Sequence, residues 1–278
     1  FASLAIELIK KLEPDYVAVA WDKPKTNIRK RREIYPEYKA GRKAAPPDFY
    51  EQIPILHELL DAFGWPLYEI DDYEADDIMG AFAVEAEAKG IETCLLTSDL
   101  DALQLISSHT KVYALKNGLS NLEEFDVDYF EKKYGIRIDQ FLDLKSLKGD
   151  SSDNLPGVPG VGEKTALKLL AAHGSVEGVY EAIDQQKGKM KEKLVANEDL
   201  AYISKQLATI ERQAPVEVKL DDLGYEGPDQ DELIRVWSEL AFKSLLEKMD
   251  YTAEETVKED LKFTVVTEIE PSILTDEM

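Results

Sequence analysis

Hydrophobic residues recur at two spacings along the first 120 residues. Phe1, Leu4, Leu8 and Leu12 lie as on one face of a helix. The apolar runs at 16–21 (YVAVAW) and 92–97 (ETCLLT) have the length of buried strands. Similar patterns predict helices over 49–63, over 74–89 and from about residue 100, and strands over 67–70 and 111–115. This alternation is typical of an α/β layer with a mostly parallel sheet.

After residue 121 the strand patterns largely stop. Helical spacing predicts helices over 126–134, 139–147, 161–172, 176–183 and 199–210, separated by short turns with Gly and Pro, and a later helix with Leu233, Trp237 and Leu240. Residues 250–278 carry nine acidic and two basic residues and one alternating segment, 263–266. We therefore expect an α/β part over 1–121, a helical part over 122–249, and over 250–278 an acidic linker with the start of a following domain.

Composition places the chain among globular proteins and limits its setting. The apolar fraction is 44%, enough for a real core, and no apolar run approaches membrane-spanning length or the pattern of a signal peptide. The one cysteine, Cys94, excludes a disulfide within the chain and favours a reducing cytoplasm. Because Cys94 lies in an apolar run, we expect it to be buried.

The charge is distributed unevenly. A net charge of −23 argues against nucleic acid, because phosphate groups repel a carboxylate surface. Residues 23–43, however, carry a local charge of +7, which indicates either a directed contact with phosphate or a solvated charged loop. The basic residues of this segment are Lys23, Lys25, Arg29, Lys30, Arg31, Arg32, Lys39, Arg42 and Lys43.

Carboxylates gather where the predicted strands end and where helices or turns begin. In a parallel sheet, functional groups collect at the carboxyl ends of strands. Oxygen ligands without His or Cys suit Mg²⁺ or Mn²⁺, and two such ions would neutralise so many carboxylates. Helix capping and turn formation are the alternative for each residue, and spacing alone leaves both open. The acidic residues are Asp22, Glu74, Asp76, Asp77, Asp99, Asp101, Asp150 and Asp153.

A glycine-rich turn stands between two predicted helices. Gly157, Gly160 and Gly162 precede a helix that carries Lys164 and Lys168. Backbone N–H groups beside a helix N-terminus bind anions, and such a turn suits a DNA backbone without reading bases. An ordinary tight corner between two helices is the alternative.

Four motifs, in this order and spacing, resemble the 5′-nuclease domain of bacterial DNA polymerase I, a member of the flap-endonuclease superfamily. They are YKAGR (38–42), YEADD (73–77), TSDLDALQL (97–105) and GDSSDNLPGVPGVGEKTA (149–166). The resemblance runs from Phe1 to about Met249. It implies a PIN-like core, with a mostly parallel sheet flanked by helices, followed by a helix-three-turn-helix (helix-hairpin-helix) DNA-binding region.

The resemblance also implies a function. It is divalent-metal-dependent hydrolysis of DNA phosphodiesters at 5′ ends and 5′ flaps, serving RNA-primer removal, nick translation and repair. It implies two Mg²⁺ or Mn²⁺ ions and a K⁺ ion at the hairpin. The expected partners are DNA with a 5′ flap, nick or RNA-primed 5′ end and the polymerase domains of the same chain. We expect a monomer that is located at the nucleoid in the bacterial cytoplasm and does not bind a membrane.

The resemblance gives roles to residues. All eight carboxylates match the family's metal residues, with Glu74, Asp76 and Asp99 holding one ion and Asp150 and Asp153 serving the second. Lys39 and Arg42 match a basic pair in a helical arch over the site. These two and Asp76, Asp99 and Asp150 are the expected catalytic residues. DNA contacts are expected from Arg29, Lys30, Arg31, Arg32, Lys39, Arg42, Gly157, Gly160, Gly162 and Lys164, while Tyr35 and Tyr38 either stack on bases or pack within the arch.

The sequence departs from the family at three places. The family begins with a strand that ends in a metal-binding Asp followed by Gly, and this chain starts after that point. We therefore expect the sheet to lack a central strand and the site to lack one carboxylate, with activity impaired. Leu100 stands where many relatives carry a basic residue, and Ser98 where glycine is usual. Neither change removes a ligand.

Three other functions compete with this one. A PIN-like ribonuclease is disfavoured by the glycine hairpin and by YKAGR. A structure-specific DNA-binding fragment without catalysis stays open because of the missing carboxylate. A dinucleotide-binding enzyme is disfavoured because the glycines follow a helical region and not a strand.

Overall fold

A computed structural model describes residues 1–42, 45–115, 122–217 and 219–247. The chain divides into two compact units, residues 1–227 and 228–278. In the described part of the second unit, helix α11 (Gln230–Glu239) is capped by Asp229, and its Leu233 and Trp237 are buried, as their spacing predicts. Lys43 and the expected strand at 263–266 lie outside the described residues.

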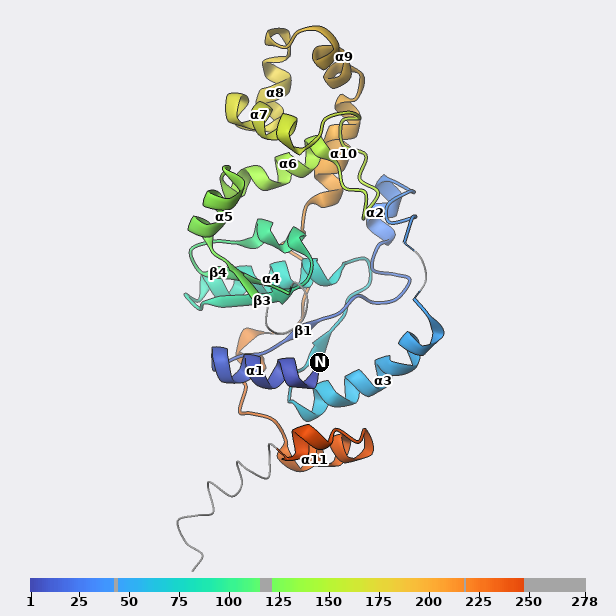
Figure 1. Cartoon of the computed structure of the whole chain (residues 1–278), viewed down its shortest axis with the longest axis vertical. Coiled ribbons are helices and arrows are strands. Elements are labelled where there is room, and N and C mark those ends of the chain that lie inside the picture. Colours follow the sequence, from blue (N-terminus) through green and yellow to red (C-terminus); the bar gives the residue numbers. More distant parts are fainter. Residues whose placement is uncertain (43–44, 116–121, 218, 248–278) are drawn as a thin grey trace, which may run out of the picture. The chain divides into compact units, whose positions relative to one another are not determined.

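Two short parallel strands open the first unit after helix α1 (Ala2–Leu12). Strand β1 (Val19–Ala20) pairs with β2 (Leu67–Tyr68), Val19 opposite Leu67. Helix α3 (Pro47–Ala62) comes between them in sequence and starts with a proline, whose missing N–H costs nothing there. Helix α4 (Ala75–Ala88) follows β2 and packs against both β1 and β3 (Figure 1).

A second sheet contains strands β3 (Thr93–Thr97), β4 (Thr110–Leu115) and β5 (Leu122–Phe125). β3 and β4 are parallel, with the 3-10 helix η1 (Leu100–Leu105) between them, and β5 is antiparallel to β4. In the described residues, β1 and β3 therefore belong to separate sheets rather than to the one expected. β5 escaped prediction because Glu123 and Glu124 conceal its apolar pattern.

The helical part contains α5 (Val127–Tyr134), α6 (Phe141–Lys148), α7 (Glu163–His173), α8 (Val176–Glu181), α9 (Gly188–Ala196) and α10 (Glu198–Ala208). Asp126 caps α5 and Ser175 caps α8 by accepting hydrogen bonds from backbone N–H groups. The spacing did not predict α9, in which only Leu194 is buried. The 3-10 turns η2 (Ile138–Gln140), η3 (Ile183–Gln185) and η4 (Leu220–Leu223) connect these elements.

One apolar core runs through the sheet and the helices of the first unit. Val112 and Phe125 of the sheet and Phe130 of α5 join Leu144 and Leu170 from α6 and α7 in a single buried cluster. This core crosses the boundary expected at residue 121, so the strands and helices on the two sides stabilise each other.

The expected burial of Cys94 is wrong: its side chain is exposed. Side chains alternate across a strand, and the next residue of β3, Leu95, is the one that enters the core cluster. Burial of part of the thiol still raises the pKa of Cys94.

Candidate active site

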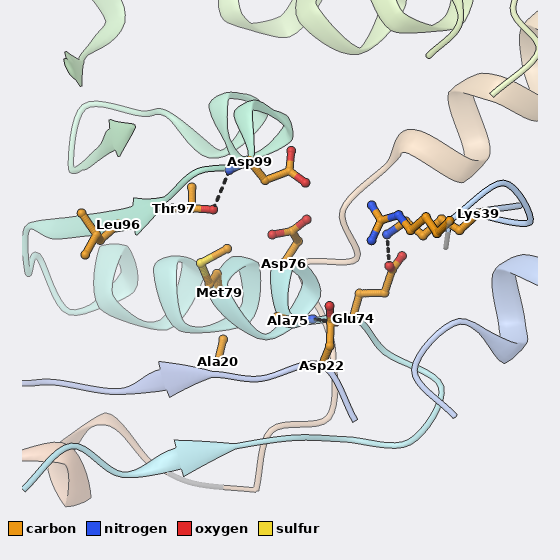
Figure 2. Close-up of a pocket in the computed structure, with 11 residues that line it drawn as sticks. Ala20, Asp22, Lys39, Glu74, Ala75, Asp76, Met79, Leu96, Thr97 and Asp99 are labelled. Carbon is orange, nitrogen blue, oxygen red and sulfur yellow. Dashed lines mark hydrogen bonds and ion pairs between the residues drawn. The ribbon is translucent and has the colours of Figure 1, made fainter. Parts of the chain in front are cut away.

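A cavity of about 220 Å³ lies where β1 and β3 end and α4 begins. Figure 2 shows Asp22, Asp76 and Asp99 around it, with Lys39 of the segment after helix α2 (Arg29–Ile34) at its edge. This is the carboxyl edge that parallel strands offer for a site. The lining residues are Ala20, Asp22, Lys39, Arg42, Glu74, Ala75, Asp76, Met79, Leu96, Thr97 and Asp99.

The pocket carboxylates also shape the backbone that carries them. Glu74 is the N-cap of α4 in a capping box with Asp77. The N–H of Ala75 donates to Asp22 Oδ1 at 2.8 Å, and the N–H of Asp101 donates to Asp99 Oδ1 at 2.9 Å. Helix capping and a place in the pocket are thus not alternative interpretations of these residues, because the same carboxylates do both.

Asp76 is the most perturbed carboxylate of the pocket. Burial, followed by the charges of Asp99 and Glu74, raises the pKa of Asp76 to about 7. A carboxylate held among others at low solvation is stabilised by any added cation, so the pocket is suited to hard positive ions.

A tyrosine and two cations from residues 38–42 close one side of the pocket. The Tyr38 hydroxyl donates to Glu74 Oε2 at 2.8 Å, and Lys39 Nζ donates to Glu74 Oε1. Arg42 donates to Asp153 Oδ1 at 2.6 Å, and Lys39 Nζ lies 3.6 Å from Asp153 Oδ2. Tyr38 is 3% exposed, so it packs in the site rather than offering a surface for stacking. Burial and Glu74 raise its pKa.

Asp77 lies beneath the pocket rather than in it, and its side chain is 1% exposed. Both of its oxygens accept from Arg31, at 2.7 and 2.8 Å, and Oδ1 also accepts from the N–H of Glu211. Burial lowers the pKa of Arg31, whereas the hydrogen bonds and the charge of Asp77 raise it. The net effect is a raised pKa. Asp77 was expected to bind metal and Arg31 to contact DNA. In the structure the two instead form a buried ion pair with each other.

Lys145 on α6 joins two other expected metal residues. Its Nζ donates to Asp101 Oδ1 and, at 2.8 Å, to Asp150 Oδ2. Burial raises the pKa of Asp101. For Asp150, burial is outweighed by hydrogen bonds from Lys145 and Ser152, which hold its pKa at about 2. Sequence reasoning missed Lys145; the available signal was a lysine between Leu144 and Leu147 on a predicted core helix.

The carboxylates approach one another without converging on one point. Across the described ranges, no three His, Cys, Asp or Glu side chains are close enough to hold one ion together. Asp22, Glu74, Asp76 and Asp99 share the pocket, whereas Asp101, Asp150 and Asp153 are held beside it by Lys145, Lys39 and Arg42.

The glycine hairpin has one buried and one exposed side. Gly157 has φ of +57°, its N–H donates to Ser204 Oγ at 2.8 Å, and a Cβ there would lie 2.3 Å from the N atom of Gly149. This closeness allows only glycine and removes Gly157 from contact with a phosphate. Gly160, Gly162 and Lys164 are exposed and remain suited to that contact.

The basic segment is tied to an acidic one. Arg29 pairs with Asp72 at 2.6 Å, Lys23 pairs with Asp71 at 2.9 Å, and Lys30 lies 3.8 Å from the ring centroid of Tyr73. Arg32 donates to the carbonyl of Tyr38. These contacts place residues 38–42 against the pocket, while Arg29, Lys30 and Arg32 remain exposed.

Comparisons with known proteins define the class to which this fold and pocket belong. Residues 1–135 match the family described as 5′-3′ exonuclease, N-terminal resolvase-like domain, and residues 136–231 match the 5′-3′ exonuclease, C-terminal SAM fold. The chain belongs to the 5′-3′ exonuclease family.

The resemblance indicated by the four motifs is confirmed by relatives of the whole chain. DNA polymerase I of Bacillus caldotenax is 43% identical over 99% of this chain, and that of Streptococcus pneumoniae strain R6 is 43% identical over 100% of this chain. The chain spans about a third of those proteins, 32% and 31% of their lengths. It is a homologue of the 5′-3′ exonuclease domain of DNA polymerase I.

Solved structures share the fold. Bacteriophage T5 5′-exonuclease with bound zinc has a TM-score of 0.63 at 23% identity, covering 86% of this chain and 88% of its own. The catalytic core of Rad2 in complex with DNA has a TM-score of 0.56 at 17% identity, covering 84% and 76%. The expected α/β nuclease core with a helical second region is thereby confirmed. No helix in the described parts of the chain is long and apolar enough to cross a membrane.

Proposed function

We propose that this chain hydrolyses DNA phosphodiesters at 5′ ends and 5′ flaps with two divalent cations, Mg²⁺ or Mn²⁺. The observation that carries the proposal is the pocket in which four carboxylates face two cationic side chains, Lys39 and Arg42, at the carboxyl edge of the strands. Membership of the 5′-3′ exonuclease family supports it. The T5 exonuclease to which the fold is similar binds zinc.

The donors present fit hard cations. The acidic side chains of the pocket offer carboxylate oxygens, and burial together with the charges of Asp99 and Glu74 raises the pKa of Asp76. No three carboxylates of the described residues now lie close enough to hold one ion together. We therefore propose that ion binding would draw Asp22, Glu74, Asp76 and Asp99 together around one ion, and that Asp101, Asp150 and Asp153 would serve a second. When bound, such ions would activate water and stabilise negative charge on the phosphate. Asp77, whose oxygens accept from Arg31, would position Glu74 rather than bind metal.

Lys39 and Arg42 have a separate part in this mechanism. In the structure, Lys39 neutralises Glu74 and Arg42 neutralises Asp153. The divalent ions would neutralise the same two carboxylates. With divalent ions on those carboxylates, the ammonium of Lys39 and the guanidinium of Arg42 would be free to bind the non-bridging oxygens of the scissile phosphate. They would orient it and stabilise the charge that develops on it.

The wider biological role follows from the relatives. We propose DNA with a 5′ flap, a nick or an RNA-primed 5′ end as substrate, for primer removal, nick translation and repair. Its partner would be the polymerase domains of the same chain. The protein would act as a monomer at the bacterial nucleoid. Gly160, Gly162 and Lys164 would contact the duplex, with K⁺ at that hairpin, and Arg29, Lys30 and Arg32 the single strand.

A 5′-labelled DNA flap incubated with this chain and Mg²⁺ or EDTA tests the proposal. We expect cutting only with Mg²⁺ and its loss in Asp76→Asn, with Asp139→Asn, an exposed residue remote from the pocket, as the matched control. Flap binding without Mg²⁺-dependent product would instead favour the alternative of a catalytically impaired DNA-binding fragment. Faster cutting of single-stranded RNA than of the flap would favour a ribonuclease.

A further inference from the structure

Two residues in adjoining segments beside the pocket have a left-handed backbone although neither is glycine. Lys39 has φ of +54° and Asn154 has φ of +58°. Asparagine tolerates this region, whereas a lysine there is strained and persists only where its surroundings hold it. The ammonium of Lys39 is one of the two cations proposed for the scissile phosphate. What holds its backbone therefore bears on the reaction.

Two hydrogen bonds join the segment of Lys39 to the turn of Asn154. The N–H of Lys39 donates to the carbonyl oxygen of Asp153 at 3.0 Å. Asn154 Nδ2 donates to the carbonyl oxygen of Glu37 at 2.8 Å. The first bond fixes the peptide group between Tyr38 and Lys39, and the second fixes the peptide group before Tyr38. Together they set the direction in which the backbone enters Lys39.

The turn that carries Asn154 is closed on itself and anchored in the core. Asp150 and Leu155 exchange two backbone hydrogen bonds, of 3.0 and 2.7 Å. The side chain of Leu155 is buried in the same apolar cluster as Tyr38. The turn therefore offers a fixed surface against which the backbone of Lys39 lies.

The bond from Asn154 differs in kind from the ion pair that also holds Lys39. The ammonium of Lys39 is paired with Glu74 (Figure 2), a carboxylate that a divalent ion would neutralise in its place. The bond from Asn154 ends on a backbone carbonyl, which carries no net charge for such an ion to neutralise. This bond would therefore survive ion binding and keep the lysine beside the pocket during the reaction.

We propose that Asn154 is a positioning residue, which holds the backbone of Lys39 in its left-handed conformation and so directs the ammonium to the scissile phosphate. Asparagine suits the position because it tolerates the left-handed region and because its amide can donate to a neighbouring carbonyl. The inference rests on the proposed function for the reaction and deepens it. Asn154 acts through Lys39 and touches no reacting atom.

The test replaces Asn154 by glycine, which adopts the same backbone without strain and lacks the amide donor. With the full chain, Mg²⁺ and a 5′-labelled flap, we expect Asn154→Gly to lower kcat about fivefold, the factor that one net hydrogen bond supplies, and to leave KM within about twofold. The matched control is Asn197→Gly. It removes a bond of the same kind and length, from Asn197 Nδ2 to the carbonyl of Lys193 at 2.8 Å, and should change neither constant.

A double variant separates positioning from a general effect on the fold. In Lys39→Ala the lysine is absent, so adding Asn154→Gly should slow cutting further by less than about twofold. A larger further loss would show that Asn154 does not act through Lys39 and would overturn the proposal. An unchanged kcat in the single variant Asn154→Gly would overturn it too.

Amide hydrogen exchange in EDTA gives a readout that needs no cutting. The N–H of Lys39 is bonded to Asp153. We expect Asn154→Gly to speed the exchange of this amide about fivefold and to leave that of Gly157, beyond the turn, unchanged. Equal exchange of the Lys39 amide in the two proteins would contradict the proposal. Failure of the proposed function appears separately, as absence of Mg²⁺-dependent cutting by the unsubstituted chain, and the exchange comparison does not depend on that result.

Discussion

At the residue scale, Asp76 combines a role in the pocket with a cost to the fold. Burial and two neighbouring carboxylates raise its pKa to about 7, from an unfolded value near 4. Ionised Asp76 therefore destabilises the folded state above pH 7, and this penalty disappears as the pH falls through 7 toward 4.

Asp76→Asn should accordingly abolish cutting and stabilise the fold in EDTA. At pH 8 we expect the free energy of unfolding to rise by an amount on the order of 2 kcal/mol, and the gain to vanish near pH 4. Urea unfolding at the two pH values measures it. A loss of stability at pH 8 would contradict the electrostatic account of Asp76.

Lys145 is a second residue whose effect can be separated from catalysis. Its ammonium holds Asp101 and Asp150 together, and its side chain is 7% exposed. Lys145→Met leaves two facing carboxylates without a cationic partner, so we expect a loss of about 3 kcal/mol in urea unfolding. Lys148→Met, on the same helix as Lys145, removes a half-exposed pair with Glu163 of α7 and should cost under about 1 kcal/mol.

Divalent ions give this variant a further readout. Because Mg²⁺ can neutralise Asp101 and Asp150 in place of the ammonium, millimolar Mg²⁺ should raise the urea midpoint of Lys145→Met more than that of the unsubstituted chain. Equal shifts in the two proteins would remove Asp150 from the proposed metal residues.

At the scale of elements, helix α2 is held by charge rather than by burial. None of its residues is buried, and the contacts Arg29–Asp72 and Lys30–Tyr73 fasten it to the segment that leads into α4. The same contacts occupy cations that DNA phosphates would otherwise bind. The acidic segment thus positions the basic one and would compete with DNA for it.

Asp72→Asn should therefore tighten binding to single-stranded DNA. Freeing Arg29 adds about one phosphate contact, so the slope of log K against log salt should become more negative by about 0.7. Asp139→Asn is the control, because it frees Arg137 away from the pocket. A slope unchanged in Asp72→Asn, or changed equally in both variants, would show that Arg29 does not contact DNA.

At the scale of the whole molecule, two family domains share one core. The cluster that includes Val112 of β4, Phe130 of α5 and Leu170 of α7 crosses the junction between residues 135 and 136. Neither part can bury its apolar face without the other. The boundary between the two family domains is therefore not a boundary between two separately stable parts of the fold.

Residues 1–227 should consequently unfold in one cooperative step. We expect coincident urea transitions for a fluorescent label on the exposed Cys94 of β3 and for the far-UV signal, which the helices of the second half dominate. Two separated transitions would show that the shared core does not couple the halves.

The sequence by itself determined most helices, the α/β layer and the chemistry of the site, because periodic burial and hard oxygen donors are local properties of the chain. It also identified Asp22, Glu74, Asp76 and Asp99, since strand ends and helix starts collect functional groups. Helices α2 and α9 and strand β5 escaped it. α2 buries no residue and α9 buries only Leu194, so neither has an apolar stripe, and two glutamates interrupt the apolar pattern of β5.

Only the tertiary structure decided how eight similar carboxylates differ. Asp77 is buried against Arg31, Asp101 and Asp150 share Lys145, and Asp153 receives Arg42. These partners are 46, 44, 5 and 111 residues away along the chain. The pKa of a carboxylate and its freedom to bind an ion depend on burial and on such distant charges, which residue spacing does not contain.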